Sequence, residues 1–168
     1  MTSFNLRQVK LRPGEEHREA LDVALPVLQF GGQSYVPVPA EIPAALTISR
    51  AITGTVFTLD FQARLHGPCH RCLDDAVIDI PIRAREYQAE NPDHEELTTP
   101  YLVESQLHVS EWAKDAVALA LPDQILCRRD CAGLCPACGK NLNTEPHEHE
   151  AETPDSRLSA LEQLRDQL

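Results

Sequence analysis

Six cysteines and two histidines are the residues of this chain whose types and spacing could support chemistry. Two Cys-x2-Cys pairs each place two sulfurs on one short turn, and the zinc–thiolate bonds of a tetrahedral site, about 2.3 Å long, require that convergence. In a reducing compartment, clustered thiols favour metal over disulfides. We therefore predict one or two bound Zn²⁺ ions. The candidate ligands are Cys69, Cys72, Cys127, Cys131, Cys135, Cys138, His147 and His149.

The sequence leaves the grouping of these ligands open. In one grouping, the first Cys-x2-Cys pair shares an ion with Cys127 and Cys131, and the second pair shares another with His147 and His149. In the other, the two pairs form a single ribbon-like site. The two histidines would face the same side of an extended segment, or they are simply solvated in an acidic tail.

The thiolate-rich composition favours closed, structural sites over catalytic ones. An open catalytic site keeps a water position and a general base, and His147-Glu148-His149 lacks the one-turn spacing of the zinc hydrolase motif. The alternative is a thiol-disulfide oxidoreductase that uses Cys69 and Cys72, because Arg71 between them could lower a thiol pKa. Four further cysteines and the lack of a βαβ pattern argue against it. We predict no catalytic residues and no enzymatic activity.

The elements around the first pair predict how it is positioned. Residues 53–65 and 77–84 have the alternating, β-branched character of strands, and the Cys-x2-Cys turn lies between them. This arrangement indicates a β-hairpin with a metal knuckle at its tip. Residues 86–106 are polar and suggest a long surface loop. Ser110 is a candidate N-cap for a buried helix that Pro122 ends.

These elements predict an α+β fold: an antiparallel β-rich body with one buried helix and a cysteine-rich zinc-binding module. We assign residues 1–126 to the body, which includes the knuckle at 69–72, and residues 127–150 to the Cys/His segment. Leucines spaced three or four residues apart predict a short amphipathic C-terminal helix within 151–168.

Charge and composition limit the partners and the location. The formal net charge of -11 disfavours extended binding to duplex nucleic acid, which normally needs a basic face. The sequence shows no signal peptide pattern and no long apolar run, so we expect a cytoplasmic protein without a membrane partner. Nothing in the sequence implies a small-molecule substrate.

Several motifs of this chain resemble those of the YceD family, which is named for accumulation of the large ribosomal RNA subunit. They are Cys69-x-Arg71-Cys72-Leu73, the Ala118–Pro122 segment, and the run from Cys131 through Cys135-Pro-Ala-Cys138-Gly-Lys-Asn-Leu-Asn143. The resemblance implies a bacterial cytoplasmic protein that supports 23S rRNA synthesis, processing or stability without a known catalytic centre. Where many relatives carry Cys-x-Cys, this chain has His147-x-His149, an exchange that preserves zinc ligation.

The resemblance also implies partners, namely a ribosomal protein, an rRNA-processing factor or the 23S rRNA precursor. The basic residues near the knuckles are candidate contacts to RNA or to a partner, although they could simply neutralise thiolate charge. Because the chain is acidic, we favour action through a basic protein partner. The candidate contact residues are Arg71, Arg128, Arg129 and Lys140.

Overall fold

The computed structural model describes residues 1–91 and 97–149. The chain divides into two compact units, and the division falls between Cys131 and Ala132. Cys127 and Cys131 therefore belong to the first unit, whereas the second Cys-x2-Cys pair lies in the second. The C-terminal helix predicted within 151–168 lies outside the described residues.

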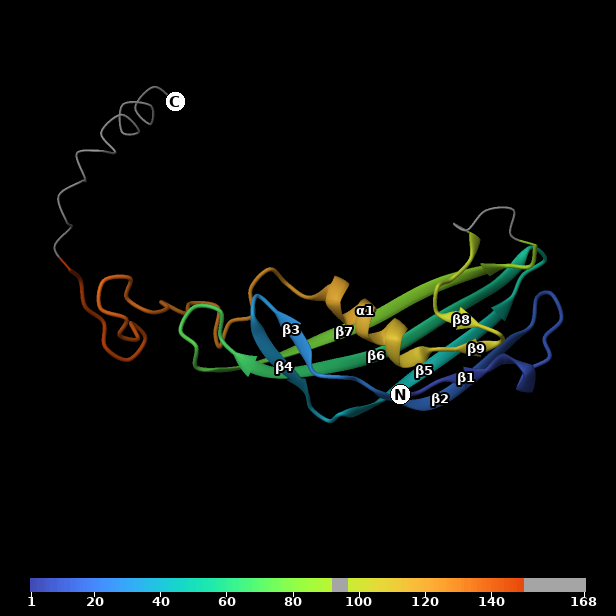
Figure 1. The fold of residues 1–168 in the computed structure, drawn as a ribbon, viewed down its shortest axis with the longest axis horizontal. Coiled ribbons are helices and arrows are strands. Elements are labelled where there is room, and N and C mark those ends of the chain that lie inside the picture. Colours follow the sequence, from blue (N-terminus) through green and yellow to red (C-terminus); the bar gives the residue numbers. More distant parts are fainter. Residues whose placement is uncertain (92–96, 150–168) are drawn as a thin grey trace, which may run out of the picture. The chain divides into compact units, whose positions relative to one another are not determined.

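The first unit is built mainly from antiparallel strands (Figure 1). In the larger sheet, β6 is central: β7 pairs along one side of it, and β5 and then β4 pair along the other. β2 pairs with β5, β3 pairs with β4, and a smaller sheet has the order β1-β9-β8. The strands are β1 (Phe4–Asn5), β2 (Glu16–Ala24), β3 (Leu28–Phe30), β4 (Gln33–Pro37), β5 (Glu41–Arg50), β6 (Gly54–Pro68), β7 (Asp75–Ala89), β8 (Leu102–Val103) and β9 (Gln106–Leu107).

The predicted hairpin is present and is longer than its sequence pattern indicated. β6 and β7 each have 15 residues and pair from Gly54 with Ala89 to Pro68 with Asp75. The first Cys-x2-Cys turn therefore lies at the tip of the hairpin. The extra length is at the ends: β6 continues through Gly67 and Pro68, which are typical of turns, and β7 continues through the mostly polar residues 85–88.

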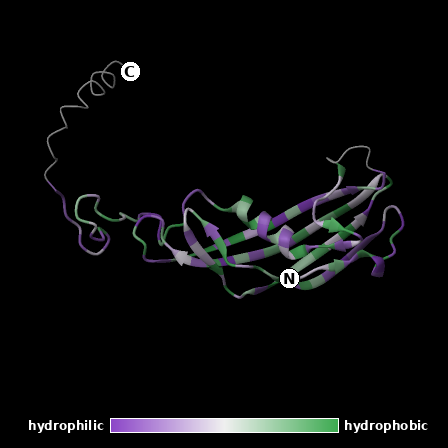
Figure 2. Ribbon diagram, viewed as in Figure 1, coloured by the Kyte–Doolittle hydropathy of each residue, from purple (hydrophilic) through white to green (hydrophobic). Residues whose placement is uncertain are grey.

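The core lies on one face of the larger sheet. Phe57, Leu59 and Phe61 of β6 are buried and pair with buried residues of β5. Residues between them face the other way and are polar or exposed, so hydropathy alternates along the strands (Figure 2). One face of the sheet is thus packed and the other is open to solvent.

The helix α1 (Val109–Ala120) covers the packed face and contacts the outer strands β7 and β2 (Figure 1). Its buried side includes Trp112, Ala113 and Val117, whereas Leu119 is 89% exposed. The helix is therefore buried on one side only. Among the residues that the structure describes, no helix has the length and apolar composition needed to cross a lipid bilayer.

Two local predictions were wrong. The N-cap of α1 is His108, not Ser110; Ser110 is buried inside the first turn, where its hydroxyl accepts a hydrogen bond from Thr2 N at 2.7 Å. Because Val109 is buried in the core, the helix begins at Val109, before the predicted N-cap Ser110. Residues 86–106 are also not one loop, because β7 continues to Ala89 and two short strands, β8 and β9, form a hairpin in this segment.

Candidate metal centres

The first cluster joins the tip of the β6–β7 hairpin to the segment that follows α1. Its ligand atoms, from Cys69, Cys72, Cys127 and Cys131, all lie within 4.8 Å of one another. A backbone hydrogen bond from His70 N to Ile125 O, 2.8 Å long, fastens the two segments beside the sulfurs. All four cysteines belong to the first unit, so the cluster connects parts of one compact body.

The spacing of the sulfurs fits a tetrahedral ion. Sγ of Cys69 lies 3.8 Å from Sγ of Cys131, and Sγ of Cys72 lies 3.6 Å from Sγ of Cys127. Four sulfurs, each about 2.3 Å from a central zinc, would be about 3.8 Å apart. A disulfide would bring two sulfurs to about 2.05 Å, so this geometry is that of free thiols around a common centre.

The thiols of the first cluster experience opposing effects on their pKa values. Burial would raise the pKa of Cys69, but backbone N–H groups of Cys72, Cys127 and Arg71 donate to its sulfur and lower that pKa to about 6. Burial raises the pKa of Cys72, and its neighbouring thiols add to that effect. Burial also raises the pKa of Cys127, although the hydrogen bond with Cys72 acts in the opposite direction. The thiol of Cys69 therefore ionises more readily than those of Cys72 and Cys127. A dication would allow the remaining sulfurs to ionise.

Burial of this cluster argues for a structural role. Cys69 is 0% exposed and Cys72 is 3% exposed. A redox-active Cys-x2-Cys pair needs one sulfur that a substrate disulfide can reach. The lowered pKa of Cys69 would otherwise suit a redox centre, but its sulfur is shielded from solvent.

The second cluster lies in a small loop module of the second unit. Its ligand atoms, from Cys135, Cys138, His147 and His149, also lie within 4.8 Å of one another. Cys135 N donates to Lys140 O, and Gly139 N donates to Cys135 O, both at 2.8 Å. Gly139 has a φ of +72°, so glycine suits this position. The Cys135-Pro-Ala-Cys138-Gly139 sequence thus forms the tight turn that its composition predicted.

His147 is oriented as a ligand by its own backbone neighbour. Its Nδ1 donates to the carbonyl oxygen of Glu145 at 2.7 Å, which leaves Nε2 as the acceptor nitrogen. Nε2 lies 3.1 Å from Sγ of Cys138, somewhat closer than the spacing of about 3.6 Å expected around zinc. Backbone N–H groups of Cys138 and Ala137 donate to Cys135 and lower its pKa to about 6 despite burial.

The structure therefore has the first of the two groupings that the sequence left open. It also reveals supporting residues that the spacing of ligands did not indicate. Asn143 Oδ1 accepts from Ala132 N at 2.8 Å, and Asn141 Oδ1 accepts from Asn143 N at 2.9 Å, so two asparagines close the second module. Near the first cluster, the buried Tyr35 donates from Oη to Pro68 O at 3.0 Å. Only the Asn-Leu-Asn run was a sequence signal for these residues.

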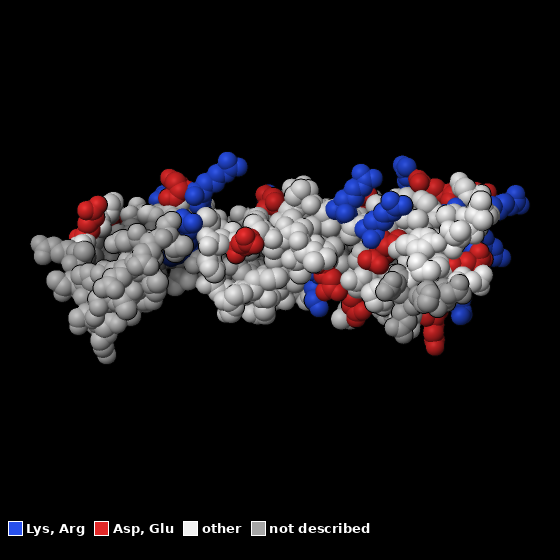
Figure 3. Space-filling view, turned by 90° about the horizontal axis from the view of Figure 1, so that it is seen from above, with Lys and Arg blue, Asp and Glu red and all other residues white. Residues whose placement is uncertain are grey.

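The four candidate contact residues are exposed, and three have local partners. Arg71 Nη1 donates to Cys131 O at 3.2 Å, so it braces the first cluster. Arg128 lies near Asp130, and Lys140 Nζ lies 2.7 Å from Glu145 Oε2. In Figure 3, Lys and Arg are interspersed with Asp and Glu over the face in view. That face does not present the continuous basic surface expected of a duplex-binding protein.

Comparison with known proteins places both clusters inside the part of the chain that matches a protein family. Residues 57–165 match the family described as "Large ribosomal RNA subunit accumulation protein YceD". That description refers to accumulation of an RNA and names no enzymatic reaction.

Similar chains occur in mycobacteria. Uncharacterized proteins of Mycobacterium bovis and Mycobacterium tuberculosis are each 35% identical over 109 residues, which cover 61% of this chain and 50% of the relative. One of Mycobacterium leprae is 32% identical over 92 residues, covering 51% of this chain and 42% of the relative. The matches thus span half or less of the length of these relatives. No solved structure matches the chain.

Proposed function

Because this chain belongs to the YceD family of large ribosomal RNA subunit accumulation proteins, we propose that it supports the synthesis, processing or stability of 23S rRNA. It acts as a binding protein in the bacterial cytoplasm and catalyses no reaction. The observation that carries the proposal is the family match over residues 57–165, which includes all eight candidate ligands.

The two clusters hold zinc as a structural element in this proposal. Sulfur spacings of 3.6 and 3.8 Å and backbone N–H groups directed at Cys69 support a closed thiolate site in the first unit. The histidine orientation supports a mixed sulfur and nitrogen site in the second unit. When bound, zinc would crosslink the hairpin tip to the segment after α1 and, in the second unit, the Cys-x2-Cys turn to the histidines. The eight ligands named above would hold the two ions.

The acidic charge supports action through a protein partner. A net charge of -11 opposes contact with a long stretch of RNA phosphates. A ribosomal protein or an rRNA-processing factor with a basic surface would instead be attracted to this chain. Direct contact with the 23S rRNA precursor is the alternative, and Arg128 and Arg129 are exposed.

The test combines a cellular and a biochemical measurement. Cells that lack the protein should show a reduced ratio of mature 23S to 16S rRNA, which the intact gene restores. Affinity capture from lysates with and without ribonuclease should retain the same protein partner in both. An unchanged rRNA ratio would end the proposal, whereas loss of every partner after ribonuclease would favour direct RNA contact.

A further inference from the structure

The outer edge of β7 is open to pairing. Within residues 1–91 and 97–149, β7 pairs with β6 and with no other strand. Backbone bonds just beyond the two ends of the hairpin fix which groups face outward: Glu90 N donates to Thr53 O, and Cys69 N donates to Asp74 O. Bonded and non-bonded pairs alternate in an antiparallel ladder. Even-numbered residues of β7 therefore bond to β6, and odd-numbered residues direct their N–H and C=O groups outward.

Pro81 is consistent with this assignment. It pairs with Gln62 at a position where no N–H is needed by β6, and proline within sheets is confined to such edge positions. The next outward N–H groups belong to Arg83 and Arg85. These two hydrogen-bond donors, with the outward carbonyl group of Arg83 between them, are thus spaced as an added strand requires.

A groove runs along this edge. Residues 81–86 of β7 line a cavity of about 370 Å³ together with Tyr101 and the α1 residues Trp112, Ala116, Leu119 and Ala120. Successive residues of a strand point to opposite faces. Because six consecutive residues of β7 line this groove, the groove is bounded by the backbone edge of the strand. Leu119, 89% exposed, forms an apolar wall without a covering residue in the described part of the chain.

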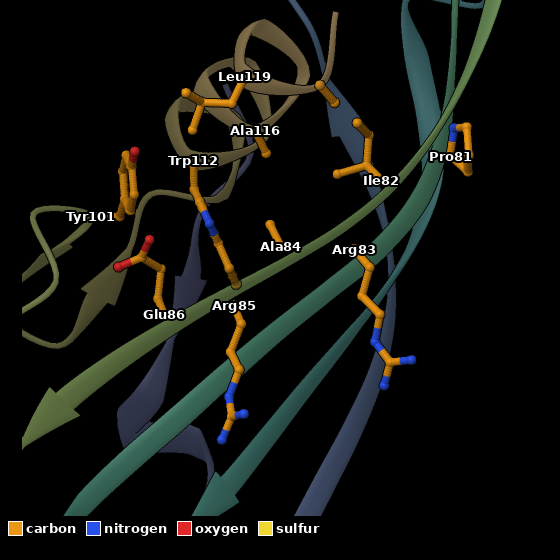
Figure 4. A pocket seen from close by; sticks show the side chains of 11 residues that line it. Pro81, Ile82, Arg83, Ala84, Arg85, Glu86, Tyr101, Trp112, Ala116 and Leu119 are labelled. Atoms are coloured by element: carbon orange, nitrogen blue, oxygen red, sulfur yellow. The ribbon is translucent and has the colours of Figure 1, made fainter.

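The two sides of the groove differ in chemistry. In Figure 4, Ala84 and Glu86 point toward α1 and Tyr101, whereas the guanidinium groups of Arg83 and Arg85 point to the opposite side. Arg83 has a distant partner, with Nε 3.5 Å from Asp60 Oδ1. A strand added here would present one face to apolar helix residues and the other to two arginines.

We propose that the edge of β7 binds an extended segment of a partner protein in which apolar and acidic residues alternate. The backbone edge selects an extended chain, and main-chain hydrogen bonds give the affinity. Leu119 and Ala120, which are exposed on α1, select apolar side chains on one face, and Arg83 and Arg85 select carboxylates on the other. The inference does not depend on the rRNA role proposed above, although it supplies a surface for a protein-mediated one.

A second copy of this chain is a less suitable occupant. Antiparallel pairing of two β7 strands centred on the groove would place Arg83 opposite Arg85 of the other copy, or opposite its own equivalent. Like charges directly opposite each other destabilise a strand pair. Charge complementarity therefore favours an acidic segment over self-association.

Binding of a synthetic peptide tests the inference directly. The probe is a fluorescently labelled peptide of alternating valine and glutamate, about six residues long, titrated with the full chain and followed by anisotropy. A valine–lysine peptide is the matched control. We expect saturable binding of the first peptide and at least about tenfold weaker binding of the second.

Three variants separate the contributions of backbone and side chain. Arg83→Pro removes an outward N–H without removing a bond to β6, and it should abolish binding. Arg83→Ala keeps that N–H and should weaken binding about threefold. Leu119→Ser changes an exposed helix residue and should weaken binding about tenfold even if Arg83→Pro does not fold. Thermal melts of all three variants monitor the fold.

Four results would overturn the inference. They are failure of the valine–glutamate peptide to bind, equal binding of the valine–lysine peptide, unchanged binding by folded Arg83→Pro, and unchanged binding by Leu119→Ser. Two further results would identify another occupant. A dimer that Arg83→Pro dissociates would point to a second copy, and slow amide exchange at Arg83 and Arg85 in the isolated monomer would show that the chain covers its own edge. None of these results alters the expected 23S rRNA phenotype, so the two proposals fail separately.

Discussion

Loss of the first metal site should destabilise the molecule much more than loss of the second. The Cys72–Cys127 approach spans 55 positions, whereas the Cys138–His147 approach spans 9. If a metal crosslink restricts the unfolded chain as a disulfide does, closing these loops contributes about 4 and about 2.6 kcal/mol, respectively. The first contribution stabilises the body that contains the sheet, and the second is confined to the small loop module.

Matched double substitutions test this difference. Cys127→Ser with Cys131→Ser and Cys135→Ser with Cys138→Ser each replace one buried and one more accessible cysteine. Each variant should lose one of two zinc equivalents by elemental analysis. Only the variant with Cys127→Ser and Cys131→Ser should lower the midpoint temperature of the main unfolding transition in far-UV circular dichroism. A loss of about 4 kcal/mol corresponds to roughly 10 °C in a chain of this size.

A chelator should give the wild type the melting temperature of the first variant. Equal shifts for the two variants would refute the assignment of the sites to separate units. An unchanged melt for the first variant would refute the crosslinking role itself.

Three further predictions concern single features of the structure. Gly67→Ala should destabilise the chain by about 1–3 kcal/mol in urea unfolding, because the added Cβ would collide with the Tyr35 ring beside the first cluster; the exposed control Gln62→Ala should change stability by less than about 0.5 kcal/mol. Burial, aided by Asp115, raises the pKa of Tyr101 to about 12 from an unfolded value near 10. The stability that Tyr101 contributes through this shift is therefore complete below pH 10 and is lost as the pH rises through 12. Between pH 10 and pH 12, the free energy of unfolding of Tyr101→Phe should therefore fall less than that of the wild type. His147→Ala with His149→Ala should remove one zinc equivalent, and retention of two would show that these imidazoles are only solvated.

The sequence predicted the features that depend on local pattern. Alternation in 53–65 and 77–84 located the central hairpin, because one face of these strands is buried and the other is solvated. The pattern underestimated β7, since its last residues include exposed Arg85 and the half-buried Glu86 and Tyr87, which read as a loop. The helix start was misplaced because a polar residue, Ser110, is buried by its bonds to Thr2.

The features that the sequence could not provide depend on tertiary contacts. The spacing of the cysteines left open whether the hairpin tip meets the segment after α1, a contact that His70 and Ile125 make. The strand order is likewise not local information. It makes β7 an outer strand within the described chain, and only the order reveals that its edge is open.

Metal binding and partner binding use different parts of the first unit in this account. The four cysteines lie at the closed end of the β6–β7 hairpin, where the register ends at the pairing of Pro68 with Asp75. The groove lies further along β7, at residues 81–86. Because the metal site and the groove are separate, the metal site can be buried and stable while the groove stays accessible. β7 can then keep an open edge that would otherwise fray. A metal crosslink at the hairpin tip would hold the register of both strands, and with it the outward direction of the N–H groups of Arg83 and Arg85.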